Sequence, residues 1–337
     1  MLKTLDQKLA RIAADSACRD FILADAKDAD MGFGISAPGP ATLHSRPGRR
    51  FRSLIEFRDS IREIVRQGLV DIMLMSASTN ELLTIEERLF DHSPVTPAAR
   101  ANDTTDIWCG QSGHYKHQPS LPFQSTTIDQ IQSGRVNCAS GDRQLGANLG
   151  LYSITFNNHA ELDRESLGNY KAFRLEAESK GFRHFLEVFE PNALGDRAVS
   201  DVGAYVNDCI VRTLAGVTRA SRPVFLKIPY FGPAAMEDLA AYDPSLVIGI
   251  LGGSAGTTRD AFQLLHDARK HGARAALFGR KINLAEDQLS FVRYLRLLAD
   301  GEIAPSEAVQ AYHADLGKLG IPPARKLQQD LELTVKQ

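Results

Sequence analysis

Short apolar segments alternate with amphipathic segments of helical length along most of the chain. The clearest unit lies near the C-terminal end, where the apolar runs 247–253 and 275–279 flank residues 257–271. Within 257–271, apolar residues recur at helical spacing, and Gly272 follows as a helix-ending residue. The pattern predicts a buried strand, a helix and a second buried strand in succession.

The same alternation extends upstream. Further strands are predicted over residues 21–27, 70–76, 150–156, 184–190 and 224–230. Helices are predicted over 53–67 and 163–180, and a weaker strand is predicted between 95 and 108. Eight strands that alternate with helices are the number that closes a parallel barrel. We therefore expect an α/β protein with a (β/α)8 TIM barrel, formed as a single domain over residues 1–337.

Two stretches interrupt the alternation. Residues 32–50 are rich in glycine and proline, and residues 109–148 are polar with scattered glycine and proline. Loops longer than about 15 residues are usually functional or disordered. In a barrel, insertions that follow strands lie at the C-terminal face, which carries the active site. We expect both stretches to be loop insertions at that face.

Composition excludes several classes of protein. The 337 residues include 43% hydrophobic residues, enough for a large core in a soluble globular protein. The net charge is −2, and the arginines around 46–52 form only a local cluster, so no nucleic-acid partner is expected. The first ten residues are charged and amphipathic, unlike a signal peptide or membrane span, which predicts a cytoplasmic protein without a membrane partner. Four scattered cysteines fit a reducing compartment.

Lys227 stands in the middle of an apolar segment that reads Pro-Val-Phe-Leu-Lys-Ile-Pro-Tyr over residues 223–230. An ammonium among apolar neighbours loses hydration, and this loss favours the neutral amine, which is a nucleophile. Lysine amines prepared in this way attack carbonyl carbons and form Schiff bases. The pattern indicates covalent catalysis, and the alternative is a structural lysine paired with a carboxylate.

Two further predicted strands carry charges. Residues two apart on a strand share a face, so Asp25 and Lys27 share one face of the first strand, and Glu187 lies mid-strand in 184–190. If these faces point into the barrel, Asp25, Glu187 and Lys227 converge near its C-terminal mouth, and Lys27 is placed to meet an anionic group. Barrel interiors are dominated by branched apolar residues, which favours a catalytic cluster. A self-satisfying buried Lys–Glu pair is the alternative.

Glycines end the last two predicted strands. Gly252, Gly253 and Ser254 follow the seventh strand, and Gly279 and Arg280 follow the eighth. In barrels, the loops after these two strands often bind phosphate through backbone N–H groups, and glycine permits the close approach. We expect phosphate recognition here, with ordinary turns and solvated basic residues as the alternative.

These motifs resemble a known superfamily. The run Leu-Lys-Ile-Pro-Tyr over 226–230, the pair Gly252–Gly253, and Gly279–Arg280 followed by Ile282 are similar to the C-terminal half of the DeoC/LacD class I aldolases. Within that superfamily, the archaeal-type fructose-bisphosphate aldolases and the LacD-type tagatose-bisphosphate aldolases are the nearest in pattern. The resemblance is good from Gly150 to the end and looser before it.

The resemblance implies a Schiff-base barrel and a role for each matched residue. Lys227 is implied as the Schiff-base lysine, Glu187 as its acid/base partner and Asp25 as a substrate-contacting or proton-handling carboxylate. The backbone at the two glycine turns, together with Arg280, is implied as the phosphate site. No metal and no organic cofactor is implied, because the lysine supplies the covalent handle.

The chain also departs from the family pattern. A further lysine of the LacD-type fourth strand is replaced by Tyr152, and no tyrosine follows the fifth strand, where Phe189 and Glu190 stand instead. Arg100 and His159 are further polar residues near strand ends that could contact substrate. These departures leave the Schiff-base chemistry intact but leave the substrate open.

A zinc site is a weaker possibility. Cys109, His114, His117 and Cys138 are suitable by residue type, but their spacing is irregular, so exposed loop residues are the favoured interpretation and no metal is expected.

The sequence therefore predicts a lyase: a class I, metal-independent aldolase that forms or cleaves a carbon–carbon bond in a phosphorylated ketose or related carbonyl compound. Such barrels often associate, so a homo-oligomer is expected. Two alternatives stay open. One is a sugar-phosphate-binding barrel without turnover. The other is a non-covalent isomerase in which Glu187 is the base and Lys227 an electrophile.

Overall fold

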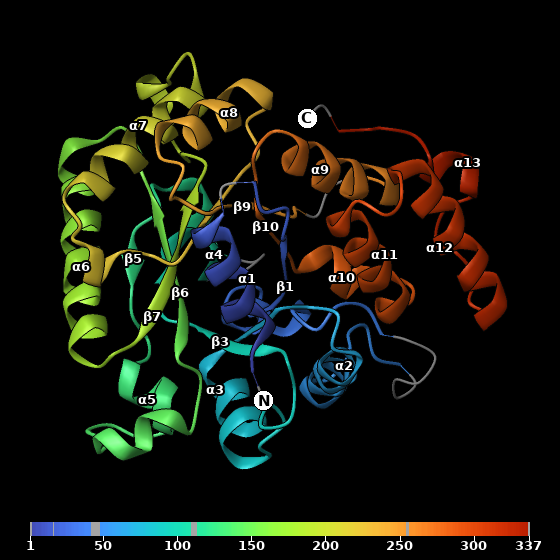
Figure 1. The fold of residues 1–337 in the computed structure, drawn as a ribbon, viewed down its shortest axis with the longest axis horizontal. Coiled ribbons are helices and arrows are strands. Elements are labelled where there is room, and N and C mark those ends of the chain that lie inside the picture. The colour runs from blue at the N-terminus through green and yellow to red at the C-terminus, as the bar shows by residue number, and fades with distance from the viewer. Residues whose placement is uncertain (1, 16, 42–47, 109–112, 254–255, 336–337) are drawn as a thin grey trace.

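Eight parallel strands close into a barrel (Figure 1). The computed structural model describes residues 2–15, 17–41, 48–108, 113–253 and 256–335. In the order in which they pair around the barrel, the strands are β1 (Ile22–Lys27), β2 (Ile72–Met75), β3 (Thr96–Arg100), β6 (Leu149–Thr155), β7 (Arg183–Phe189), β8 (Leu226–Ile228), β9 (Ile248–Leu251) and β10 (Ala275–Phe278). The (β/α)8 barrel is confirmed, and the weak strand between 95 and 108 is β3.

Helices surround the barrel, with α6 and α12 at opposite sides of the view in Figure 1. They are α1 (Thr4–Ala14), α2 (Leu54–Gln67), α3 (Ala77–Asn80), α4 (Thr105–Trp108), α5 (Ile128–Ser133), α6 (Ala160–Ser179), α7 (Val202–Ala215), α8 (Pro233–Tyr242), α9 (Thr258–Lys270), α10 (Arg280–Leu284), α11 (Gln288–Asp300), α12 (Pro305–Leu319) and α13 (Leu327–Asp330). Short 3-10 turns are η1 (Ala29–Met31), η2 (Gly34–Ser36), η4 (Tyr115–His117), η5 (Ser140–Gln144), η6 (Gly195–Arg197) and η7 (Arg219–Ser221), and η3 (Glu81–Glu86) is a π-helical turn. In the described part of the chain, no helix is both long and apolar enough for a membrane span.

Helix α2 shows how local sequence sets the element bounds. The Ser53 hydroxyl accepts a hydrogen bond from the Glu56 backbone N–H, and the Glu56 carboxylate accepts one from the Ser53 N–H, forming a capping box. At the other end Gly68 adopts φ 72°, a left-handed conformation that glycine reaches without strain. Between these caps, Phe57 and Ile61 are buried against the barrel.

Apolar side chains form two clusters, one inside the barrel and one between the barrel and the helices. The inner cluster includes Ala24 of β1, and Phe185 and Phe225 stack there with ring centroids 4.5 Å apart. Leu5 of α1 belongs to the same cluster, so α1 closes the N-terminal end of the barrel. Since the inner side chains fill the barrel up to the level of Phe185, only the C-terminal mouth is open for a site.

The segment predicted as a loop insertion over 109–148 contains regular structure where it is described. Helix α5 begins with a capping box formed by Thr127 and Gln130, and it buries Ile128 and Ile131. Strands β4 (Asp103–Thr104) and β5 (Pro122–Phe123) pair antiparallel beside the mouth. The polar composition concealed this helix because only one of its faces is apolar.

The last described residues return from α13 across α9 (Figure 1). The Asp260 carboxylate accepts hydrogen bonds from the Thr334 and Val335 backbone N–H groups, at 2.9 and 3.1 Å. The Asp330 carboxylate accepts one from the Thr258 N–H at 2.8 Å. These contacts fix the end of the chain beside the mouth of the barrel, where Val335 lines the cavity described below.

Candidate active site

Lys227 and Glu187 form an ion pair in the barrel interior. Strands β7 and β8 place the two residues side by side in register, and Nζ of Lys227 lies 2.6 Å from Oε1 of Glu187. The side chains are 7% and 1% exposed. Since Phe185 and Phe225, two residues earlier on each strand, belong to the inner cluster, the charged side chains point into the barrel directly above them.

The second oxygen of Glu187 is also held. The Ser153 hydroxyl of β6 donates to Oε2 at 2.6 Å, and a guanidinium nitrogen of Arg100 lies 3.6 Å from the same oxygen. Arg100 Nε in turn donates to Oδ2 of Asp28 at 2.6 Å. A chain of alternating charge, Asp28, Arg100, Glu187 and Lys227, therefore crosses the floor of the mouth.

The charges in this chain stabilise one another. Burial alone would raise the pKa of Asp28, but the cations of Arg100 and Lys227 outweigh it and hold the pKa below its usual range. Burial acts to lower the pKa of Arg100, and the carboxylates of Asp28 and Glu187 outweigh it and raise the pKa. Asp28 is thus an ionised carboxylate at neutral pH.

Asp25 and Lys27 lie outside this cluster. In the sheet register Asp25 is level with Met73 and Phe278, and both belong to the cluster between barrel and helices. Nζ of Lys27 lies 3.3 Å from the Asp25 carboxylate and donates to Oε1 of Gln288 on α11 at 2.8 Å. The expectation that Asp25 and Lys27 face the barrel interior is wrong.

The parity of β1 explains the error. Ala24 belongs to the inner cluster, so Ala26 and then Asp28 continue the inward face, one residue out of step with Asp25. Residues 22, 23, 24 and 26 are all apolar, and the strand therefore carries no alternation from which its facing could be read. Burial raises the pKa of Asp25 to about 6, against the opposing effect of Lys27, and burial lowers the pKa of Lys27.

The charged chain forms the floor of a cavity of about 640 Å³ at the C-terminal ends of the strands. Polar and charged residues on its walls are Asp28, Arg100, Asp106, Glu187, Glu190, Lys227, Tyr230, Asp260 and Arg280, and its glycines are Gly32, Gly252, Gly253 and Gly279. A cavity of this size accommodates a small metabolite, and the polar groups of its walls can orient that metabolite. Of the residues predicted for the site, Lys227, Glu187, Arg280 and the three glycines of the two turns all line this cavity. Ser254 lies outside the described residues.

The glycines of the two turns have packing reasons of their own. A Cβ at Gly252 would overlap the Phe278 ring, and one at Gly279 would lie 2.5 Å from the Ala26 carbonyl oxygen. Gly253 has φ 60°, which strains other residues. Backbone approach by a ligand is therefore compatible with these glycines, but they do not require one.

Arg280 is available to an anion. Its guanidinium carbon lies 5.3 Å from the centre of the Phe33 ring. Within the described ranges, Arg280 makes no hydrogen bond or ion pair, in contrast to Lys281, which donates to the Gly256 and Thr257 carbonyls. Burial lowers the pKa of Arg280, with Glu187 opposing, and the group remains a cation.

The sequence left open whether Glu190, Tyr152 and His159 belong to the site, and the structure places each of them differently. Glu190, at the end of β7, is exposed and lines the cavity. Tyr152 packs outside the barrel against Phe173, and the inward residue on β6 is Ser153. His159 caps α6, where its ring nitrogen accepts from the Leu162 N–H, and does not line the cavity.

The candidate zinc ligands are described only in part. Cys109 lies outside the described residues, His114 is exposed, and Cys138 is buried beside Asp129. Among the residues that the structure describes, three or more His, Cys, Asp or Glu side chains nowhere converge as a metal site would require.

Comparisons with known proteins bear on the fold. Neither a protein-family model nor a characterised protein sequence matches the chain. Among solved structures, an archaeal fructose 1,6-bisphosphate aldolase shares 17% identity and a TM-score of 0.60 over 88% of this chain and 100% of the aldolase. A fructose-bisphosphate aldolase from Slackia heliotrinireducens shares 14% identity and a TM-score of 0.63 over 92% of this chain and 91% of its own.

A further archaeal fructose-1,6-bisphosphate aldolase has its catalytic lysine covalently bound to the carbinolamine intermediate of its substrate. It shares 19% identity and a TM-score of 0.57 over 88% of this chain and 100% of its own. At these identities the likeness shows a common barrel fold, and the expected resemblance to archaeal-type aldolases is confirmed at that level.

Proposed function

We propose that the protein is a class I, metal-independent aldolase that forms or cleaves a carbon–carbon bond in a phosphorylated ketose or related carbonyl compound. The observation that carries this proposal is the contact of 2.6 Å between Lys227 and Glu187 on the floor of the open cavity. A buried lysine beside a carboxylate that can accept its proton is the arrangement that Schiff-base formation needs. The fold shared with Schiff-base aldolases supports the same chemistry.

The first half of the reaction forms the iminium. Glu187 accepts a proton from the Lys227 ammonium, and the neutral amine attacks the substrate carbonyl carbon to give a carbinolamine. Glu187 then donates its proton to the departing hydroxyl, which leaves as water. The resulting iminium accepts the electron pair of the adjacent carbon–carbon bond when that bond breaks.

Cleavage also needs a base for the hydroxyl of the departing carbon. With Asp25 behind the strand, the proton-handling role expected of it passes to Asp28, which faces the cavity. Asp28 takes the hydroxyl proton as the aldehyde is released, and it returns the proton to the enamine carbon before water hydrolyses the iminium. Arg100 contacts Asp28 and Glu187 and holds both carboxylates in position.

Substrate phosphate is assigned to the side of the cavity formed by β9 and β10. Arg280 supplies the charge, and the backbone at Gly252, Gly253 and Gly279 supplies close approach. Lys27 has no part in this site because it is paired behind β1.

The non-covalent isomerase is the second candidate. In it, Glu187 of the same ion pair would act as the base and Lys227 as the electrophile. Turnover of phosphorylated ketoses in the presence of EDTA distinguishes the two, with released triose phosphate and ketose–aldose conversion measured in parallel. We expect cleavage that is abolished in Lys227→Arg, since a guanidinium forms no Schiff base. Isomerisation retained by Lys227→Arg would support the second candidate, and binding without turnover would support the sugar-phosphate-binding barrel.

A further inference from the structure

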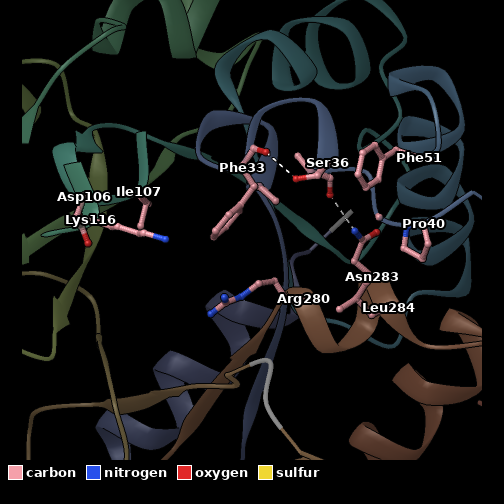
Figure 2. A pocket seen from close by; sticks show the side chains of 13 residues that line it. Phe33, Ser36, Pro40, Phe51, Asp106, Ile107, Lys116, Arg280, Asn283 and Leu284 are labelled. Carbon is pink, nitrogen blue, oxygen red and sulfur yellow. Dashed lines mark hydrogen bonds between the residues drawn. The ribbon is translucent and has the colours of Figure 1, made fainter. Parts of the chain in front are cut away.

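A second cavity of about 470 Å³ adjoins the first (Figure 2). Its walls come from the loop that follows β1, from α4 and η4, and from α10. Residues that line both cavities are Ala29, Phe33, Asp106, Ile107 and Arg280. The two cavities are therefore neighbours across one shared wall, at which Phe33 and Arg280 face each other.

The second cavity is lined mainly by apolar side chains. Its apolar side chains are Ala29, Phe33, Ala37, Pro40, Phe51, Ile107 and Leu284. Figure 2 shows Phe51, Pro40 and Leu284 on the side away from Phe33, so apolar groups stand on both sides of the space. Such a lining favours apolar parts of a ligand over hydroxyl groups.

The uncharged polar side chains of this lining, Ser36 and Asn283, are already bonded within the protein. The Asn283 side-chain amide donates to the Ala37 carbonyl at 3.0 Å, and its oxygen accepts from Arg52 at 3.1 Å. The Ser36 hydroxyl donates to the Phe33 carbonyl at 2.9 Å. A ligand hydroxyl group would find few partners among the uncharged groups of this lining, because these donors and acceptors are occupied.

The charged residues of the lining are Asp106, Lys116 and Arg280, and of these Asp106 and Arg280 belong to the shared wall. Asp106 accepts a hydrogen bond from the Ser120 hydroxyl at 2.7 Å, and Lys116 is exposed with its ammonium in reach of water. Arg280, at the shared wall, is the cation placed to meet an anionic group of a substrate in the first cavity.

The direction of the second cavity follows from the first. Strand β1 pairs with β10, so Asp28 at the end of β1 lies beside the proposed phosphate side. Asp28 is followed directly by Ala29, which belongs to the shared wall together with Arg280. Asp28 serves the half of the substrate that is released as aldehyde. That half therefore extends toward the loop after β1, past Phe33.

We infer that the second cavity is a substrate subsite for an apolar chain or ring carried by the aldehyde-derived half of the substrate. The inference rests on the proposed aldolase function for its chemistry and on the second cavity for its specificity. A phosphorylated three-carbon donor fills only the first cavity. The substrate class is accordingly a ketose phosphate, or related phosphorylated carbonyl compound, with an apolar extension.

The subsite is tested by binding of the unreactive alcohol 3-phenylpropan-1-ol, titrated by NMR into the full-length protein. Leu284→Asp places a carboxylate in the subsite, and Leu319→Asp is the matched control at an exposed leucine outside both cavities. The two leucines are 52% and 56% exposed, so neither change disturbs the core. We expect Leu284→Asp to raise the Kd at least tenfold and Leu319→Asp to leave it unchanged. Absence of binding to the wild type, or equal affinity of the two variants, would overturn the inference.

Turnover supplies the second readout. With dihydroxyacetone phosphate as donor, we expect kcat/KM for 3-phenylpropanal to exceed that for glyceraldehyde 3-phosphate, and preference for the phosphorylated aldehyde would contradict the inference. Failure of the aldolase function is recognised separately, because the donor then leaves no covalent adduct on Lys227 while the alcohol still binds in a Leu284-dependent manner. An adduct on Lys227 without binding of the alcohol would contradict the subsite and leave the aldolase function standing.

Discussion

Arg100 is the residue that joins the two carboxylates of the site. Its guanidinium contacts Asp28 at 2.6 Å and Glu187 at 3.6 Å, and both partners are buried with it. An unpaired buried charge is costly, so the three side chains need one another as partners in the barrel. Arg100 therefore holds both carboxylates at the floor of the cavity that Lys227 also lines.

The two aspartates of this region are expected to respond differently to substitution. Asp28→Asn removes the proposed base and should lower kcat by about 100-fold or more, the usual range for loss of a general base. Asp25→Asn leaves Lys27 without its partner behind the strand and should instead lower the free energy of unfolding by about 3–5 kcal/mol. Steady-state kinetics with urea denaturation of both variants checks this. A larger catalytic loss in Asp25→Asn than in Asp28→Asn, with stability unchanged, would return Asp25 to the site.

At the scale of the element, strand β7 carries function on one face and packing on the other. Glu187 points into the barrel, whereas His184 points to the helix layer, where Nε2 lies 2.9 Å from the Tyr170 hydroxyl of α6. Phe173 packs against the same imidazole with its ring edge-on. Burial lowers the pKa of His184 to about 3, with Arg174 contributing in the same direction.

This packing predicts a pH dependence of stability. The pKa of an unfolded histidine is about 6.5, so between about 3 and 6.5 the unfolded chain binds more protons than the folded protein. The contribution of neutral His184 to stability is therefore complete above about pH 6.5, and it is lost as the pH falls toward 3. The loss approaches about 5 kcal/mol, at about 1.4 kcal/mol for each unit of pKa shift.

Urea denaturation of wild type and His184→Gln at several pH values between 4 and 7 tests this assignment. Glutamine retains a partner for the Tyr170 hydroxyl but does not titrate. We expect the stability of the wild type to fall more steeply on acidification than that of the variant. Parallel pH profiles for the two proteins would mean that His184 is not the titrating group.

At the scale of the whole molecule, the sequence predicts the barrel better than it predicts the site. Strands such as β9 and helices such as α9 have unambiguous apolar runs, spacing and end signals, and their order implies closure. Lys227 and Glu187 are predicted correctly as a pair because each is flanked two residues away by phenylalanine or proline on its own face.

The remainder of the site depends on information that a single strand does not carry. The facing of β1 is set by its neighbours on both sides, and a shift of one residue turns Asp25 outward and brings Ala26 and Asp28 onto the inward face. The guanidinium of Arg100 and the hydroxyl of Ser153 become part of the site only when β3 and β6 pair, since the two residues lie far apart in the chain. The second cavity is built from the loop after β1 and from the short elements α4, η4 and α10, which are too short for apolar periodicity to give a signal.

The central claim is that Lys227 forms a Schiff base, and borohydride reduction tests it most directly. The protein is incubated with dihydroxyacetone phosphate and sodium borohydride, and the modified residue is located by peptide mass spectrometry. We expect one reduced adduct, on Lys227, that is absent in Lys227→Arg. Lys27, a buried lysine paired outside the barrel, provides the internal control and should stay unmodified. Failure to trap an adduct with this donor and other phosphorylated carbonyl compounds that bind measurably, or an adduct confined to another lysine, would contradict the account.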